Sequence, residues 1–292
     1  MEEIKGKKDS CFHGKVIYQP KGKAGEYAKW AVNFYVGCSN GCSYCYCKRG
    51  VLSHALGGSY PKLKSVFYSL AGKNGALKDC QSMAETCALS CFADEFRKNR
   101  DSIMKDGGLF YSFSTDPCLR QTFDLTYRTA INVTALRIPV TILTKCTWWV
   151  DGFIRDFSDL DSGYPKSLFN IGFTLTGHDE LEPGAASNAE RIEAMRKLHD
   201  NGFHVWSSIE PIIDCPNSWG MIRSTIDFCD YYRIGLLSGA SRDYYDRHIL
   251  QNFMKEVRRL GIQYDKKFYF KKSVKDYVDE VCDDSELKNM IK

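Results

Sequence analysis

Residues 36–47 read Val-Gly-Cys-Ser-Asn-Gly-Cys-Ser-Tyr-Cys-Tyr-Cys and contain the spacing Cys38-x3-Cys42-x2-Cys45. Three thiols so close together cannot easily form a disulfide framework. They are the soft sulfur ligands that an iron–sulfur cluster needs, and three of them hold three irons of a cubane while the fourth iron keeps an open position. Gly37 and Gly41 would let the backbone turn closely around such a cluster. The spacing therefore predicts a cluster loop with one iron free to bind a cofactor or a substrate.

Around this loop the chain alternates between strand and helix patterns. Six short segments rich in β-branched or aromatic residues span 30–36, 109–113, 139–143, 169–174, 204–209 and 231–237. The clearest helix precedes the fifth segment, because Ser187 and Glu190 form a capping box and Gly202 ends the helix. Alternating strands and helices predict an α/β fold with a parallel sheet covered by helices on its outer side. Six such units fit a partial barrel.

The cysteine loop resembles that of the radical SAM superfamily, which binds a 4Fe-4S cluster through CxxxCxxC with an aromatic residue before the last cysteine, here Tyr44. Its flanks and residues 26–33 are similar to the branch related to spore photoproduct lyase, as are 113–117 (Phe-Ser-Thr-Asp-Pro) and 143–145 (Leu-Thr-Lys). Residues 209–211, 237–239 and 268–271 look more like phage-type relatives with the same motif. The resemblance implies a partial (β/α)6 TIM-like barrel, with active residues at the carboxyl ends of the strands.

The resemblance also implies a chemistry. Cys38, Cys42 and Cys45 would hold the cluster, and its open iron would bind the amino and carboxylate groups of S-adenosylmethionine. One electron would then cleave the cofactor to a 5′-deoxyadenosyl radical that abstracts hydrogen from a substrate. Such an enzyme needs an electron donor such as a flavodoxin or ferredoxin. Cys118 and Tyr46, which lie near the cluster motifs, are the candidates for catalytic residues that pass or quench the radical.

One departure from the branch concerns the substrate. Spore photoproduct lyase carries a hydrogen-donor cysteine three residues before the aspartate of its matching segment, and this position is Phe113 here. We therefore do not expect repair of spore photoproduct. A nucleic-acid component remains a candidate substrate through the resemblance alone, and a small molecule or a peptide stays open.

Polar residues at the predicted strand ends are candidates for binding the cofactor. Ser114, Thr115 and Asp116 could accept from the ammonium group of its methionine part, although the same residue types form turns. Lys145 could pair with the carboxylate, although solvated lysines at strand ends are commoner.

Later strand ends supply further candidates for cofactor binding. Thr174 and Thr176 could contact the ribose or the carboxylate. Glu210, a carboxylate inside an apolar strand, wants a partner, and the alternative is a buried ion pair that braces the barrel. Ile212 could lie on the adenine or be a core residue. With Tyr44, these residues complete the predicted cofactor site.

Several patterns have a second interpretation. A structural zinc site formed by the three cysteines and Cys47 would make the chain a non-catalytic metal-binding interaction module. Cys80, Cys87 and Cys91 could hold a second cluster, but their spacing favours one buried helical stripe. Adjacent aromatics at 148–149 could contact a nucleic acid, although such pairs are more often one core and one rim residue. Aromatic and basic pairs at 244–245, 266–267 and 271–272 could do the same, although solvated surface is the more frequent explanation.

Composition limits the class of protein. The chain has 292 residues, 43% hydrophobic and 26% charged, which suits one α/β barrel. We expect a loosely ordered leader at 1–25, the barrel at 26–240 and an extension at 241–292, largely helical with a strand-like segment at 267–270, packed on the barrel. A charged amino terminus, no run of 18 apolar residues and an odd count of 13 cysteines predict a cytoplasmic protein with reduced thiols and no membrane contact. A balance of 40 basic to 36 acidic residues is weak evidence about nucleic acid.

Overall fold

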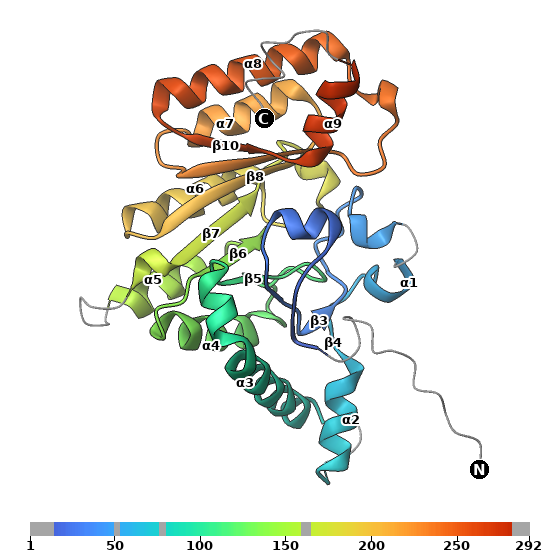
Figure 1. The fold of residues 1–292 in the computed structure, drawn as a ribbon, viewed down its shortest axis with the longest axis vertical. Helices are drawn as coiled ribbons and strands as arrows, with labels where there is room; N and C mark the ends of the chain where they lie inside the picture. The colour runs from blue at the N-terminus through green and yellow to red at the C-terminus, as the bar shows by residue number, and fades with distance from the viewer. Residues whose placement is uncertain (1–14, 50–52, 76–79, 159–164, 282–292) are drawn as a thin grey trace.

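The computed structural model describes residues 15–49, 53–75, 80–158 and 165–281. Within these residues one large sheet has the strand order β1-β2-β5-β6-β7-β8-β9-β10. Only β1 pairs antiparallel with its neighbour, and all other neighbouring strands of this sheet are parallel. The predicted α/β fold with a partial parallel barrel is therefore confirmed, and helices α4 to α8 lie along the outside of the sheet (Figure 1).

The strands are β1 (Ile17–Tyr18), β2 (Ala31–Val32), β3 (Tyr35–Val36), β4 (Lys62–Leu63), β5 (Leu109–Tyr111), β6 (Val140–Thr144), β7 (Phe169–Thr174), β8 (His204–Ile212), β9 (Tyr231–Leu236) and β10 (Lys267–Phe270). The α-helices are α1 (Ser53–Leu56), α2 (Ser65–Lys73), α3 (Gln81–Lys105), α4 (Phe123–Ala135), α5 (Val150–Ser158), α6 (Asn188–Asp200), α7 (Cys215–Thr225), α8 (Arg247–Tyr264) and α9 (Lys272–Val281). Short 3-10 turns are η1 (Gly22–Glu26), η2 (Tyr46–Lys48), η3 (Lys166–Leu168), η4 (Asp179–Leu181) and η5 (Arg242–Tyr244).

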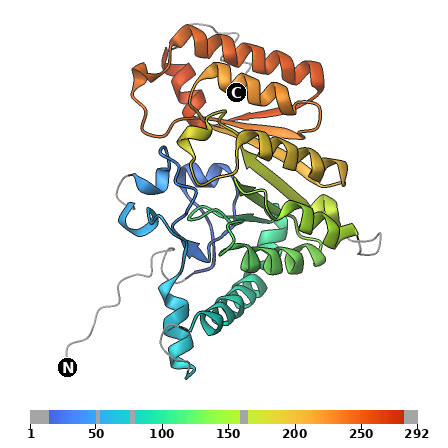
Figure 2. The same cartoon turned by 180° about the vertical axis from the view of Figure 1, so that it is seen from behind.

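The predicted strands appear in order, with two changes. The segment at 30–36 splits into β2 and β3, and β3 pairs with β4 in a separate two-stranded sheet. The extension after residue 240 adds β10 to the main sheet beside β9, so it is part of the barrel wall and not only a helical layer. From behind, α7 and α8 again lie at the β10 end, while the α2–α3 hairpin projects from the opposite end (Figure 2).

The amino-terminal part is more structured than the predicted leader. Residues 15–25 include β1 and most of η1, whereas residues 1–14 lie outside the described ranges. Residues 22–27, here called the N-terminal strap, contact the far strands of the open sheet. Arg233 donates to the Glu26 carbonyl at 2.6 Å, and the Lys272 amide donates to the Glu26 carboxylate at 2.7 Å. The strap therefore links the first strands to β9 and the start of α9.

Two apolar cores hold the sheet. The larger lies between the strands and the outer helices, and it includes Cys87 and, at its edge, Cys91 on α3; this fits the helical-stripe interpretation, with Cys80 at the helix cap. The smaller fills the barrel interior around Phe110 and Trp206. A Cβ atom on Gly172 would lie 2.2 Å from the Trp206 ring, so glycine in β7 makes room for the indole that forms the floor of the barrel.

The predicted capping box is present at the start of α6. The Ser187 hydroxyl accepts from the Glu190 amide, and the Glu190 carboxylate accepts from the Ser187 amide. Gly202 follows the helix with a φ of 84°. In the described part of the chain, none of the helices combines the length and the apolar character that crossing a bilayer would require.

Candidate functional site

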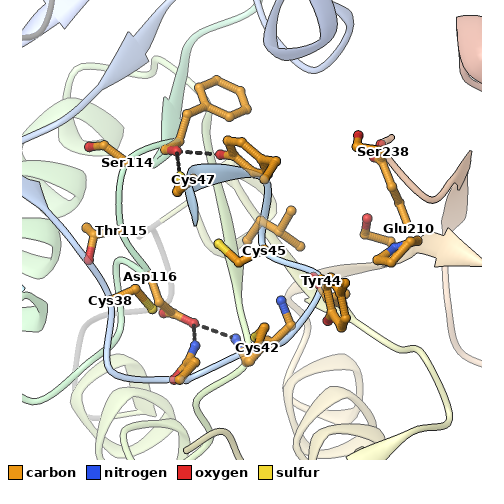
Figure 3. A pocket seen from close by; sticks show the side chains of 18 of the residues that line it. Cys38, Cys42, Tyr44, Cys45, Cys47, Ser114, Thr115, Asp116, Glu210 and Ser238 are labelled. Carbon is orange, nitrogen blue, oxygen red and sulfur yellow. Dashed lines mark hydrogen bonds between the residues drawn. The ribbon is translucent and has the colours of Figure 1, made fainter. Parts of the chain in front are cut away.

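A cavity of about 260 Å³ opens at the carboxyl ends of the parallel strands. Its lining includes Cys38, Cys42 and Cys45 from the loop after β3, together with residues from the ends of β5 to β9. Glu210 and Ser238 stand on the opposite side of this cavity from Cys38 (Figure 3). The cysteine loop thus lies at the carboxyl ends of the strands, as the sequence predicted.

Two glycines shape the cysteine loop. Gly37 has a φ of 83° and Gly41 a φ of 71°, which glycine adopts without steric cost. A Cβ on Gly37 would come within 2.4 Å of the Tyr60 carbonyl oxygen. The turn that brings the three cysteines to one cavity therefore needs glycine at this position.

The environment sets the protonation of the three thiols. Burial, reinforced by Asp116, raises the pKa of Cys38 to about 11, and burial also raises the pKa of Cys42. A hydrogen bond with the Cys47 thiol lowers the pKa of Cys45 to about 6. Because metal binding requires thiolates, loading the site would displace protons from Cys38 and Cys42.

Lys145 supplies a positive charge beside these thiols. Burial works against its charge, but the Cys42 thiolate and the Glu182 carboxylate outweigh burial and raise the Lys145 pKa. Its Nζ lies 5.5 Å from the centre of the Tyr44 ring and 3.9 Å from the Glu182 carboxylate. A cation held here would stabilise thiolates and any other anionic group in the cavity.

Asp116 acts as a brace between the cluster loop and the strand ends. Its Oδ1 accepts from the Cys118 amide at 2.9 Å and the Thr144 hydroxyl at 2.7 Å. Its Oδ2 accepts from Asn40 Nδ2 and from the Lys145 amide, both at 2.8 Å. Four donors occupy the carboxylate, which favours a structural role over direct contact with a cofactor.

The neighbours of Asp116 divide between bracing and open positions. The Ser114 hydroxyl donates to the Tyr35 carbonyl, which ties the end of β5 to β3. Thr115 Oγ1 is buried, and no partner for it exists among the described residues. Thr115 also lines the cavity, so its hydroxyl is the polar group of this segment that is free for a ligand.

A second brace holds Tyr44. Its hydroxyl donates to Glu182, which also pairs with the buried Arg191 of α6. Arg191 donates further to the carbonyls of Thr174 at 2.7 Å and Ala186 at 2.8 Å. Tyr44 is thus fixed from outside the cavity. Glu182 was not predicted from sequence, whereas Arg191 stands out in retrospect as a charged residue on the buried stripe of α6.

The structure identifies the partner of Glu210, which the sequence could not. Lys271, directly after β10, places Nζ 2.9 Å from both carboxylate oxygens, and the Tyr27 hydroxyl donates to the same group. Tyr27 also lies 3.1 Å from Ser208 Oγ. All four residues line the cavity, so this cluster closes the wall opposite the cysteines.

Three predicted site residues lie elsewhere. Cys118, Thr176 and Ile212 are fully buried, and none of these three belongs to the cavity lining. Cys118 lies in a turn whose carbonyl accepts from Trp148, and the Thr176 hydroxyl accepts from the His178 amide. Ile212 follows a register shift in the β8–β9 ladder, which interrupts the alternation that turns Ser208 and Glu210 toward the cavity.

The remaining predicted residues line the cavity. Thr174 is buried there, and Tyr46 is 54% exposed with its hydroxyl donating to the Phe113 carbonyl. Cys47 also lines the cavity, with Sγ 3.6 Å from the same carbonyl. In the described ranges no three His, Cys, Asp or Glu side chains converge as they would on a single metal ion. A cubane spreads its cysteine ligands over separate irons, so thiols around a shared cavity fit it better than they fit one zinc ion.

Comparisons with known proteins agree with this architecture. No protein-family model matches the chain. The chain is 26% identical over 271 residues to an uncharacterized protein of Methanocaldococcus jannaschii, covering 90% of this chain and 88% of the relative. Its structure is similar to a spore photoproduct lyase variant, with a TM-score of 0.59 and 12% identity over 86% of this chain and 79% of that one. A second variant, solved with dinucleoside spore photoproduct, gives a TM-score of 0.57 and 13% identity over 85% and 78%. At these identities the likeness concerns the fold alone, and the chain has the partial-barrel fold seen in spore photoproduct lyase.

Proposed function

We propose that this protein is a radical SAM enzyme that binds a 4Fe-4S cluster through Cys38, Cys42 and Cys45 and S-adenosylmethionine in the adjoining cavity. The observation that carries the proposal is the position of these cysteines: a glycine-shaped loop brings all three to one cavity at the carboxyl ends of the strands. When bound, the cluster would supply an electron and an open iron for cleavage of the cofactor to a 5′-deoxyadenosyl radical.

The chain's own residues would orient the cofactor and shield the radical. Lys145 offers a cation beside Cys42 for the cofactor carboxylate, and Thr115 offers an unpaired hydroxyl. Thr174 is a further buried hydroxyl in the lining. Phe110, Phe113 and other apolar side chains of the lining would keep water away from a reactive intermediate.

Glu210 has a changed role in this proposal. Its carboxylate is occupied by Lys271 and Tyr27, so we assign it to holding the cavity wall and not to binding the cofactor. Tyr46 remains a candidate for contact with the radical or the substrate, because it lines the cavity and directly follows Cys45.

The test is anaerobic. Iron and sulfide are reconstituted into the full chain, dithionite and S-adenosylmethionine are added, and 5′-deoxyadenosine is quantified. We expect cleavage by the wild type, none by Cys42→Ala, and retained cleavage by Cys91→Ala, which removes a thiol on α3 outside the cavity lining. A wild type that carries a full cluster but forms no 5′-deoxyadenosine would overturn the proposal.

A further inference from the structure

The N-terminal strap forms part of the cavity wall, and its first half lies over the cavity without being buried. Lys23 and Ala24 line the cavity, as does Tyr27 at the other end of the strap. Lys23 is exposed, so the cavity meets solvent here, and this place is called the mouth. None of the residues of η1 is buried. Residues 22–25, here called the flap, therefore cover the mouth without packing into either apolar core.

Few contacts join the flap to the rest of the molecule. Lys23 Nζ donates to Ser238 Oγ at 3.1 Å, and the Lys23 carbonyl accepts from Lys271 Nζ at 3.4 Å. Within the ranges that the structure describes, these two hydrogen bonds are the flap's polar links to other elements. A segment with so few contacts opens at a small cost in free energy.

The second half of the strap is held much more firmly. Arg233 donates to the carbonyls of Glu26 and Tyr27, and the Lys272 amide donates to the Glu26 carboxylate. The Arg233 guanidinium also lies over the Tyr27 ring, 5.0 Å from its centre. Before the flap, β1 pairs with β2. The chain is therefore anchored on both sides of the flap, and a motion of the flap leaves the sheet in place.

Ser238, the partner of Lys23, is fixed from behind. Arg49, which follows the cysteine loop, donates to the Ser238 carbonyl at 3.1 Å. The preceding residue, Leu237, donates its amide to the Tyr245 hydroxyl at 2.8 Å. One end of the contact between Lys23 and Ser238 is thus rigid, whereas the other end belongs to the flap. When this contact breaks, the flap moves and the loop that carries Ser238 stays.

The other walls of the cavity are fixed by stronger contacts. Asp116 braces the cysteine side with four hydrogen bonds, and the ion pair of Glu210 with Lys271 closes the far wall. The flap instead begins at Gly22, which has a φ of 60° and nothing within 4 Å of its Cβ position. Glycine in open space is a free pivot for the backbone. The flap is therefore a part of the wall that can move while the barrel stays intact.

We infer that residues 22–25 open and close over the mouth of the cavity, that the contact between Lys23 and Ser238 is the latch, and that small molecules reach the cysteine loop by this route. The inference concerns access to the cavity, so it goes beyond the proposed function and holds for whichever group the cysteines bind. Cys42 and Cys47 line the cavity at 7% and 9% exposure. Reagents in solution therefore reach these two thiols mainly when the flap is open.

The test measures the reactivity of these thiols in the metal-free full chain, kept reduced under anaerobic conditions. Iodoacetamide is added, and the labelling of each cysteine is followed by peptide mass spectrometry. Lys23→Met removes the latch, and we expect labelling of Cys42 and Cys47 to become about fivefold faster, the factor that loss of one ordinary hydrogen bond gives. Lys23→Arg keeps a donor and should stay close to the wild type.

Lys21→Met is the matched control, because Lys21 is exposed and lies outside the cavity lining. It removes the same charge two residues before the latch and should leave labelling unchanged. A purely electrostatic effect of Lys23→Met would have the opposite sign, since removing a nearby cation disfavours the reactive thiolate. Cys91 on α3, also outside the lining, is the internal reference for loosening of the whole fold.

Ser238→Ala removes the other end of the latch. It should speed labelling as Lys23→Met does, and the double variant should be no faster than either single variant, because both changes break the same contact. Fluorescein maleimide is a bulkier reagent that needs a wider opening. It should show a larger ratio of variant to wild-type rates than iodoacetamide does.

Several outcomes would overturn the inference. These are labelling of Cys42 and Cys47 at the wild-type rate in Lys23→Met, an equal increase in Lys21→Met, additive effects in the double variant, or a parallel rise at Cys91. Formation of 5′-deoxyadenosine is measured separately on reconstituted wild type. Cleavage of the cofactor together with unchanged labelling in Lys23→Met contradicts the flap alone, whereas faster labelling without any cleavage contradicts the proposed function alone.

Discussion

Replacing Asp116 by Asn tests whether its carboxylate braces the cysteine loop. The Asn side chain keeps one oxygen for the donors at Oδ1 but turns an NH₂ group toward Asn40 Nδ2 and the Lys145 amide. Two hydrogen bonds to a charged group are lost, and each is worth about 1.5–3 kcal/mol. We therefore expect the free energy of unfolding of the apo protein to fall by about 3–6 kcal/mol, because only 8% of Asp116 is exposed and water replaces few of the lost hydrogen bonds.

The assay is urea denaturation followed by tryptophan fluorescence. Asp124→Asn is the matched control, since Asp124 is an exposed carboxylate on α4 paired with Arg128 at 3.3 Å, and its loss should cost less than about 0.5 kcal/mol. Iron content after reconstitution should fall in Asp116→Asn and not in the control. An Asp116→Asn protein within about 1 kcal/mol of the wild type, and with full iron content, would refute the idea of a brace.

Three further predictions follow from the geometry. Gly37→Ala should abolish iron incorporation, because its φ of 83° and the 2.4 Å approach to a carbonyl exclude a Cβ; Gly22→Ala, with a φ of 60° but nothing within 4 Å, should retain iron measured by colorimetric assay. Lys271→Met should lower the free energy of unfolding by about 3–5 kcal/mol by leaving Glu210 unpaired, and adding Glu210→Gln should recover most of it in urea melts; no recovery would argue against the pair. Burial lowers the His178 pKa, but hydrogen bonds to two carboxylates outweigh it and raise the pKa overall. The stabilisation is thus complete below the unfolded-state pKa and lost as pH rises through the folded-state value, so urea stability should decline across that interval in the wild type and stay flat in His178→Gln; an increase with pH would contradict the assignment.

Helices and strands were predicted well where short-range sequence patterns determine their bounds. β7 has the predicted bounds at 169–174, and the cap of α6 is formed by the expected pair. The segment at 30–36 failed as one strand because Asn33 is buried and uses its side chain for tertiary hydrogen bonds, donating to the Tyr18 hydroxyl and accepting from the Phe113 amide. Hydrogen bonds between a side chain and residues distant in the sequence cannot be predicted from a window of seven residues.

Residues of the candidate site could likewise be predicted only where the pattern is local. The spacing of Cys38, Cys42 and Cys45 is local, so the sequence could predict them as cluster ligands, and it could predict Glu210 as a carboxylate in need of a partner. Lys271 could not be assigned to it, since 61 residues separate the two and only the pairing of β10 with β9 brings them together. Cys118 and Ile212 lie outside the cavity lining because a turn and a register shift decide which way a side chain points, and neither follows from a local pattern.

The position of the far cavity wall has a consequence for biosynthesis. A nascent chain that has emerged through β7 already contains every cysteine of the cluster motif, but it lacks Glu210 and Lys271. The N-terminal strap gains three of its anchors only when β9, β10 and the start of α9 exist, because these anchors are Arg233, Lys271 and Lys272. If the three cysteines bind a cluster as proposed, their thiols must stay reduced until the last quarter of the chain is made, and iron and sulfide would enter the finished cavity after translation.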